Sequence, residues 1–134
     1  MAGDYPHPEE NTTNRPFLDA WREGRLALQH CSACQLTFFY PREMCPRCWS
    51  PELTWSEAAG HGVVVSYTLI HRPLHAAFEP DVPVVMAEIT LDEGASLLGR
   101  VVGHQHLEIR SGDRVRLVPQ DLAQSYPLPT FELA

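Results

Sequence analysis

Residues 31 to 48 read CSACQLTFFYPREMCPRC, and this stretch holds every cysteine of the 134-residue chain. The cysteines form two Cys-x2-Cys pairs, Cys31 with Cys34 and Cys45 with Cys48, and ten residues separate the pairs. A Cys-x2-Cys turn lets two sulfurs converge on one metal ion, and two such turns supply the four thiolate ligands that tetrahedral Zn²⁺ prefers. The spacing therefore predicts a zinc ribbon.

The same four cysteines are open to other interpretations. They could form two disulfides, or they could be unrelated buried thiols. Iron fits the same sulfur geometry, as in a rubredoxin-like site, and zinc is favoured only because it is the commoner metal there. A closed four-cysteine site leaves no open position for water or substrate, so its metal is structural. We expect zinc to stabilise the fold and to take no part in chemistry.

The N-terminal segment does not resemble a targeting signal. The first 24 residues have neither the basic start nor the apolar core of a secretory signal, and no apolar run approaches the roughly 20 residues of a membrane span. Reduced thiols that bind a metal also fit a reducing compartment better than disulfides do. We therefore expect a cytoplasmic protein without a membrane partner.

Charge is spread evenly along the chain, with a formal net charge of -7. Residues 1 to 60 hold five Arg against eight Asp and Glu, and residues 61 to 134 hold five against nine. Nucleic-acid binding needs a concentration of positive charge, which neither half offers. All ten basic residues are Arg, and the absence of Lys excludes Schiff-base chemistry and a lysine-dependent phosphate loop.

Composition and pattern divide the chain into three segments. An N-terminal arm and helix occupy residues 1–24, the ribbon occupies 25–58, and a second domain occupies 59–134. Residues 1–13 are polar and contain proline, which predicts a flexible arm or one that drapes over a partner.

A short helix should follow the arm. Asn14 or Thr13 suits its N-cap, Pro16 is tolerated in the first turn, and Gly24 is a natural stop. The helix places three apolar side chains on one face, Phe17, Ala20 and Trp21. This face packs either on the chain's own core or on another subunit.

The rest of the chain reads as strands. The ribbon should contain a strand over residues 25–30 and a return strand over 38–40, and the pattern then changes to the period of two that is typical of half-buried strands. Five strand-like segments fill the last 75 or so residues, a count that suits a small closed Greek-key barrel of the OB type. These segments are 63–70, 84–91, 95–102, 114–118 and 131–133, with the short stretch 104–109 ambiguous. The predicted fold is mainly β: a short N-terminal helix, a rubredoxin-like zinc ribbon and a five-stranded OB-fold barrel.

In this order the motifs resemble a known family, the bacterial and archaeal zinc-ribbon plus OB-fold proteins that accompany thiolase-like acyl-CoA enzymes and were once catalogued only as a domain of unknown function. The resemblance runs from about Pro16 to Phe131. It rests on the aromatic helix up to Gly24, LALQHC at 26–31, YPR at 40–42 ahead of CPRC at 45–48, GHGVVVSYT at 60–68 and LDEG at 91–94. The chain departs from the family at Ser111-Gly112-Asp113, where relatives often have an Ile-Gly pair followed by an apolar residue.

The resemblance implies a non-catalytic accessory subunit that forms a hetero-oligomer with a thiolase-like partner. Members look like obligate companions of thiolases, acyltransferases of the thiolase superfamily, steroid side-chain aldolases or acyl-CoA hydratases. The ribbon and helix would be the docking elements, and an acyl-CoA thioester could lie at the shared interface. The ribbon could help to hold the CoA moiety, with Arg42 and Arg47 as the nearest fixed guanidinium groups for its phosphates. Ordinary surface or partner-facing arginines are the alternative.

Catalytic machinery is hard to place in this sequence. A thiolase needs a cysteine nucleophile and a second thiol or histidine, and the predicted metal site uses every cysteine. The serine-hydrolase elbow, a Gly-rich phosphate loop and a His-Glu-x-x-His helix are all missing. Glu88 could pair with Asp92 or Glu93 as acid and base, but no spacing argument supports the pair. We therefore predict no catalytic residue in this chain alone.

The histidines suggest weaker sites. His104 and His106 would share a face if their stretch were extended, which resembles a metal pair without a third ligand. His71 and His75 lie in the loop between the first two barrel strands, where OB folds often contact ligands, although a solvated loop explains them as well. His30, beside Cys31, could replace a metal ligand only if the four thiolates did not complete the site.

Two other functions remain as alternatives. An OB-fold protein that binds single-stranded nucleic acid could use aromatic residues such as Tyr67 as stacking platforms, and the acidic charge balance argues against it. A free-standing acyl-CoA hydrolase or hydratase would need a general base that the sequence does not reveal.

Overall fold

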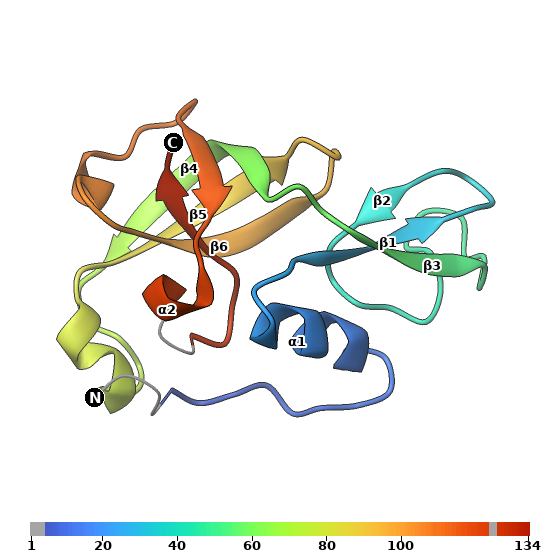
Figure 1. Ribbon diagram of the computed structural model, residues 1–134, viewed down its shortest axis with the longest axis horizontal. Helices are drawn as coiled ribbons and strands as arrows, with labels where there is room; N and C mark the ends of the chain where they lie inside the picture. Colours follow the sequence, from blue (N-terminus) through green and yellow to red (C-terminus); the bar gives the residue numbers. More distant parts are fainter. Residues whose placement is uncertain (1–4, 124–125) are drawn as a thin grey trace.

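The computed structural model describes residues 5–123 and 126–134, and a small sheet and a closed barrel lie side by side in it (Figure 1). Helix α1 (Arg15–Arg22) lies at the junction between them. Its apolar face turns toward the chain's own core, with four buried residues, Phe17, Leu18, Ala20 and Trp21. The indole Nε1 of Trp21 donates a hydrogen bond to the Tyr126 carbonyl at 2.7 Å. The prediction that this face packs on the chain itself is therefore confirmed.

The segment before α1, predicted as a flexible or partner-draped arm, is anchored to the chain itself at Tyr5. Tyr5 is buried, its ring stacks 5.2 Å from that of Phe78, and its hydroxyl donates a hydrogen bond to Asp81. Asn14 stands at the N-cap as predicted, but its Oδ1 accepts from the Asn11 N–H at 2.9 Å and makes no bond to the helix. An aromatic anchor in an otherwise polar segment explains why the arm folds back onto the barrel.

The ribbon contains a three-stranded antiparallel sheet in the order β2-β1-β3. Its strands are β1 (Ala27–Cys31), β2 (Thr37–Phe38) and β3 (Leu53–Glu57). The return strand was predicted over residues 38–40, but β2 ends at Phe38. Tyr40 instead turns toward the barrel, where its hydroxyl accepts from the Leu98 N–H at 3.3 Å. Strand β3 was not predicted, because its five residues bring few apolar side chains.

The barrel has five strands in the closed order β4-β5-β6-β8-β7, where β6 and β8 run parallel and the other pairs antiparallel. The strands are β4 (His61–Ile70), β5 (Val84–Leu91), β6 (Ser96–Val102), β7 (Arg114–Leu117) and β8 (Thr130–Leu133). This is the strand order of an OB fold. The predicted mainly β fold, with a short helix, a zinc ribbon and a five-stranded OB-fold barrel, is confirmed.

Short helical segments fill the connections between barrel strands. The predicted loop after β4 contains the 3-10 helix η1 (Ala76–Asp81), and the ambiguous stretch after β6 contains η2 (His106–Glu108). A four-residue helix, α2 (Gln120–Ala123), precedes β8 and was not predicted. In the described ranges no helix has the length and apolar character that crossing a membrane requires.

The ribbon and the barrel share one hydrophobic core. Leu26, Leu28 and Phe39 from the ribbon side belong to the same buried cluster as Val64, Ile89 and Phe131 of the barrel. Close packing at the centre of this core needs a glycine, because a Cβ at Gly99 would lie 2.9 Å from ring atoms of Phe131. The shared core holds the ribbon in a defined position against the barrel.

Candidate metal centre and its surroundings

The first Cys-x2-Cys turn is a tight knuckle at the end of β1. The N–H of Cys31 donates to the Leu36 carbonyl at 2.9 Å, and the N–H of Gln35 donates back to the Cys31 carbonyl at 2.8 Å. Gln35 has a φ of 66°, a left-handed conformation that glycine usually supplies. These bonds turn the side chains of Cys31 and Cys34 toward the same point.

The second Cys-x2-Cys turn repeats this backbone. The N–H of Cys45 donates to the Ser50 carbonyl at 2.9 Å, and the N–H of Trp49 donates back to the Cys45 carbonyl at 2.9 Å. Trp49 has a φ of 68°, so it occupies the left-handed position that Gln35 fills in the first turn. The repetition brings two pairs of sulfurs to one site from opposite sides.

The four sulfurs lie within 4.8 Å of one another. The Sγ atoms of Cys31 and Cys48 are 3.6 Å apart, and so are those of Cys34 and Cys45. A disulfide would bring two sulfurs to about 2.05 Å, so these distances do not fit disulfides. Four sulfurs around a tetrahedral zinc ion, each about 2.3 Å from it, lie about 3.8 Å apart. The geometry therefore fits one tetrahedral metal with four thiolate ligands.

The electrostatics of the cluster favour a divalent cation. A hydrogen bond from the Leu36 N–H, helped by the Arg47 guanidinium, lowers the pKa of Cys34 to about 6. The Ser50 N–H acts in the same direction on Cys48, but burial and the three neighbouring sulfurs outweigh it and raise the pKa of Cys48 to about 12. Four adjacent thiols cannot all ionise without a compensating charge, and a bound Zn²⁺ would supply it.

Of the two arginines singled out from the sequence, Arg42 precedes the second knuckle and Arg47 lies within it. Arg47 donates from Nη2 to the Cys34 carbonyl at 2.7 Å, so its guanidinium links the two knuckles. Arg42 is held through its backbone, because the buried side chain of Gln29 accepts from its N–H at 2.8 Å and donates to its carbonyl at 2.9 Å. The structure places both beside the metal centre, but only Arg47 has a role in holding it together.

Around the second knuckle lies an exposed surface with several apolar groups, which we call the second-knuckle face. It borders a hollow of about 540 Å³ and consists of Pro41, Arg42, Glu43, Met44, Pro46 and Trp49. Trp49 leaves 73% of its surface exposed and Met44 leaves 47%. Large exposed apolar side chains that gather in one place are typical of interaction sites.

The predicted histidine sites do not form. His106 lies in η2, where the strand geometry that would align it with His104 is absent, and its Nδ1 donates to the Gly103 carbonyl at 3.0 Å. In the described part of the chain the four cysteines are the group arranged to hold a metal, and neither histidine belongs to it. His75 caps η1 by accepting from the Ala77 N–H at 3.0 Å, which is a structural role. His71 is exposed in the loop before η1.

The remaining candidates are engaged elsewhere. His30 contacts the Thr37 hydroxyl at 2.9 Å and Gln35 at 3.0 Å, which places it beside the knuckle without making it a metal ligand. Asp92 pairs with Arg114 at 2.9 Å, and Glu93 accepts from the Ala59 N–H at 2.8 Å. Neither is arranged with Glu88, which stands opposite Ser66 and Leu98 in the sheet.

Sequence reasoning missed two buried polar residues whose side chains hydrogen-bond to the backbone of other segments. Gln29 and Arg100 are both 4% exposed, yet nothing in their local sequence predicts a partner far along the chain. The one available signal was Arg100 itself, a charged residue in the apolar run of β6.

Together, the paired knuckles and the closed five-stranded barrel define a zinc ribbon joined to an OB fold. Two family models match: residues 18–54 match the ChsH2 rubredoxin-like zinc ribbon domain, and residues 55–120 match the ChsH2 C-terminal OB-fold domain. The chain belongs to this ChsH2 family, whose relatives are also described as DUF35 proteins.

Solved structures agree with this assignment. A chain of the Ltp2-ChsH2(DUF35) aldolase superposes with a TM-score of 0.77 at 34% identity, covering 95% of this chain and 98% of that one. A DUF35 protein of unknown function from Sulfolobus solfataricus superposes with a TM-score of 0.65 over 92% of this chain and 87% of its own, at 17% identity, and shares the fold.

Curated relatives are longer than this chain. A probable enoyl-CoA hydratase alpha subunit from Thermomonospora curvata is 36% identical over 129 residues, which are 96% of this chain and 40% of that protein. A DUF35 domain-containing scaffold protein from Methanocaldococcus jannaschii is 33% identical over 89 residues, 66% of this chain and 62% of that protein. The chain thus spans less than two thirds of both relatives.

Proposed function

We propose that this chain is a non-catalytic accessory subunit of a thiolase-superfamily acyl-CoA enzyme, and that its four cysteines hold a structural zinc ion. The observation that carries the proposal is the convergence of all four thiols on one site, which leaves no cysteine for a thiolase-type nucleophile. The names of relatives support the proposal of a partner enzyme. One relative is part of an aldolase with Ltp2, one is a scaffold protein, and one is a hydratase subunit.

The second-knuckle face is the proposed docking surface. Trp49 projects from a knuckle whose backbone is fixed by hydrogen bonds and, when loaded, by the metal, so its exposed ring loses little conformational freedom on binding. Exposed tryptophans beside arginines are common energetic centres of interfaces. Helix α1, which the resemblance also suggested for docking, has its aromatic face buried in the chain and could contribute only its polar side.

Contact with CoA is a finer proposal. Arg42 is exposed beside the hollow of the second-knuckle face and is better placed to meet a phosphate than Arg47, which already bonds to the Cys34 carbonyl. An acyl-CoA bound by the partner would then reach the shared interface near Arg42.

Co-expression with a thiolase-like candidate partner would test the assembly. We expect a stable complex, and the substitution Trp49→Gly should weaken it by about 2 kcal/mol, a roughly thirtyfold rise in Kd measured by calorimetry. Glycine suits the left-handed backbone at this position, so the ribbon should stay folded. Leu74→Ala is the matched control, because Leu74 is fully exposed and distant in sequence from the ribbon.

Absence of any complex, or equal effects of the two substitutions, would contradict the assembly or its docking surface. For CoA, the variant Arg42→Ala should lower the apparent CoA affinity of the complex, whereas Arg72→Ala, in the exposed loop after β4, should not. An unchanged affinity in the Arg42→Ala and Arg47→Ala double variant would remove the CoA proposal and leave the assembly untouched.

The contacts of the barrel arginines disfavour binding of single-stranded nucleic acid. Arg114 and Arg116 of the barrel pair with Asp92 and Glu132, and Arg100 is buried. Tyr67 is 42% exposed on β4, but stacking needs a basic groove to follow the phosphates.

A further inference from the structure

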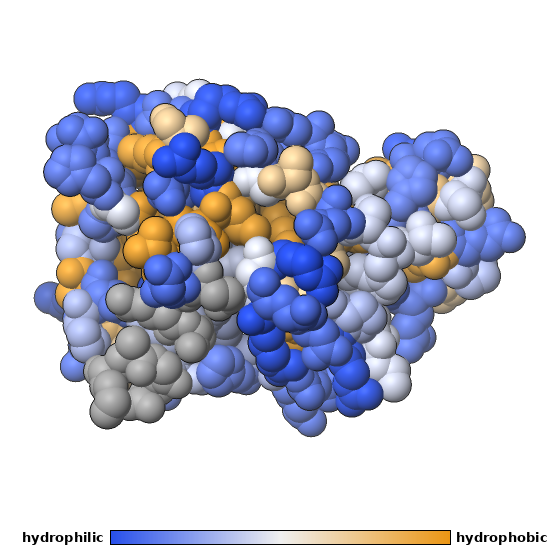
Figure 2. All heavy atoms as spheres, in the orientation of Figure 1, coloured by the Kyte–Doolittle hydropathy of each residue, from blue (hydrophilic) through white to orange (hydrophobic). Residues whose placement is uncertain are grey.

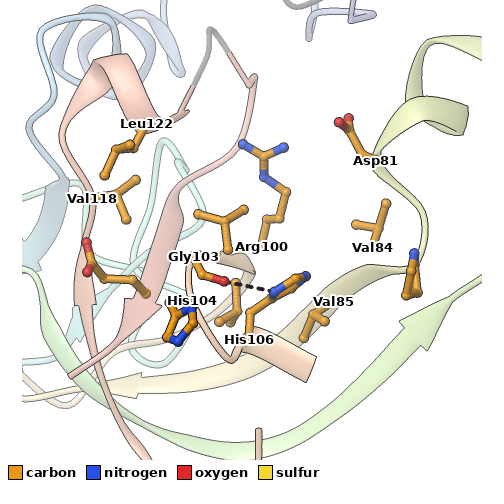
Figure 3. Close-up of a pocket in the computed structure, with 13 residues that line it drawn as sticks. Asp81, Val84, Val85, Arg100, Gly103, His104, His106, Val118 and Leu122 are labelled. Carbon is orange, nitrogen blue, oxygen red and sulfur yellow. Dashed lines mark hydrogen bonds between the residues drawn. The ribbon is translucent and has the colours of Figure 1, made fainter. Parts of the chain in front are cut away.

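A second hollow, of about 510 Å³, opens at the end of the barrel where β5 begins and β6 ends (Figure 3). Asp81 of η1, the histidines His104 and His106, and Leu122 of α2 border it on different sides. Figure 2 shows apolar surface gathered over the barrel above α2. The volume of the hollow falls in the range of about 300–1,000 Å³ that is typical of small-molecule sites. We call it the barrel-end cavity.

The wall of the barrel-end cavity is aliphatic. Its apolar side chains are those of Pro83, Val84, Val85, Val101, Val102, Val118 and Leu122. Five of these seven side chains are β-branched and stiff at χ1, so the wall keeps its shape. Apart from the imidazoles of His104 and His106, no aromatic ring among the described residues lines it. A branched or alicyclic hydrocarbon body matches such a wall.

One charged group in the lining is buried and keeps an unpaired hydrogen-bond donor. Arg100 is 4% exposed, its Nη2 donates to the Ala123 carbonyl at 2.9 Å, and its guanidinium carbon lies 3.7 Å from the centre of the Tyr126 ring. Its Nε is buried and has no hydrogen-bond partner among the described residues. Buried donors are nearly always paired, so this nitrogen indicates a missing acceptor.

The acidic groups of the lining are already engaged. Asp81 accepts the hydroxyl of Tyr5, and Glu132 pairs with Arg116 at 3.2 Å. The Nδ1 of His106 donates to the Gly103 carbonyl, as the dashed line in Figure 3 marks. Arg100 is therefore the charged lining residue that still offers a donor.

We propose that the barrel-end cavity binds a small monocarboxylate with a branched or alicyclic aliphatic body, whose carboxylate accepts from Arg100 and whose hydrocarbon part lies on the valine wall. The proposal concerns a site on the barrel, away from the second-knuckle face, and does not depend on the identity of a partner enzyme.

Titration of the zinc-loaded full chain with cyclohexanecarboxylate, followed by ¹⁵N NMR, would test this site. We expect saturable shifts of the Val84, Val101 and Val118 amides and of the Arg100 Nε resonance. The neutral cyclohexanecarboxamide should bind about tenfold more weakly or worse, because hydrogen bonds between charged groups are roughly twice as strong as neutral ones. Cyclohexylmethylamine, a cation of similar shape, should not bind.

Arg100→Gln should abolish binding of the acid, and two further variants keep the test decisive even if Arg100→Gln fails to fold. Leu122→Asp adds a carboxylate at the mouth of the cavity, on a side chain that is 53% exposed, and should abolish binding of the acid. Leu74→Asp makes the same change at a fully exposed leucine outside the cavity and should leave binding unchanged. Equal affinity for acid and amide, tighter binding of the amine, no effect of Leu122→Asp, or no saturable shift at all would each overturn the proposal.

Discussion

The two Cys-x2-Cys turns have the same backbone but different surroundings. In the first, Cys31 is the last residue of β1 and is completely buried, and the Gln35 side chain bonds to His30 at 3.0 Å and to the Ser32 carbonyl at 2.9 Å. In the second, Cys45 is also buried, but Cys48 is exposed and the Trp49 ring extends into solvent. One turn is therefore built into the sheet, and the other presents side chains outward.

Within one metal site, the first knuckle would then support the fold and the second would contact a partner. The first knuckle is held by the sheet, whereas the second is connected to it through the Gln29 side chain, the bond from Arg47 to the Cys34 carbonyl and the proposed metal. A single ion would then fix an exposed loop to a rigid sheet. Substitutions that act on one knuckle at a time can test that division.

The largest effect should come from replacing one cysteine in each knuckle. Cys31→Ser places a poor ligand at a fully buried position, so zinc should be lost and the ribbon strands β1 to β3 should unfold. Cys48→Ser should keep zinc at reduced affinity, because water can complete the fourth position at an exposed site. Zinc content and hydrogen exchange measured by mass spectrometry would show both results.

The barrel provides the internal control for these variants. Amides of β5 should stay protected in both, because the barrel strands pair with one another and not with the ribbon sheet. Equal loss of zinc in the two variants would show that burial of the cysteine does not decide how well the site retains zinc.

A smaller effect should appear in the pH dependence of zinc binding. The pKa of Cys34 falls from 9.0 to about 6 through the Leu36 N–H and the Arg47 guanidinium. The stabilisation from this thiolate is complete above pH 9.0, and it is lost as the pH falls through about 6. Protons therefore compete for this ligand only below about pH 6, where zinc affinity measured by chelator competition should fall more steeply.

Arg47→Gln should move that change in slope to higher pH, because it removes one cause of the lowered pKa. Arg42→Gln is the matched control, since the contacts of Arg42 with Gln29 use its backbone. A change in slope that stays at the same pH in Arg47→Gln would show that the backbone alone sets the pKa of Cys34.

The smallest effect should come from glycine at the two left-handed positions. Trp49→Gly removes backbone strain of about 1 kcal/mol and should raise the free energy of unfolding by a similar amount. Gln35→Gly relieves the same strain but loses two side-chain hydrogen bonds worth about 1 kcal/mol each, so it should lower stability. Urea unfolding of the zinc-loaded variants would compare them. A destabilised Trp49→Gly variant would mean that the ring stabilises the fold and is not reserved for a partner.

Local pattern was enough to predict much of this molecule. The spacing of the cysteines predicted one cluster because each pair is held by a turn of only a few residues. Strand β5 was predicted with its observed bounds, since Val85, Ala87, Ile89 and Leu91 alternate cleanly toward the core. The difference between the knuckles was not predicted, because their sequences specify the same turn and burial comes from the surrounding sheet.

Features that depend on distant partners could not be read from the sequence. The hydrogen bond between Tyr5 and Asp81 joins residues 76 positions apart, and the contact of Trp21 with Tyr126 joins residues 105 apart. Arg100 lies on an apolar strand, and only the fold shows that α2 and Tyr126 cover it. Such contacts also explain why the packing of Tyr5 on the chain itself was not predicted for the N-terminal arm.

The order of strands around the barrel also bears on how the chain is made. Strand β8 lies between β6 and β7, so neither of these can complete its pairing until residues 130–133 have been synthesised. The ribbon, in contrast, is complete once β3 ends at Glu57. During translation the metal site can therefore assemble first, and a zinc-loaded ribbon would offer Leu26, Leu28 and Phe39 as a surface on which the later strands collect.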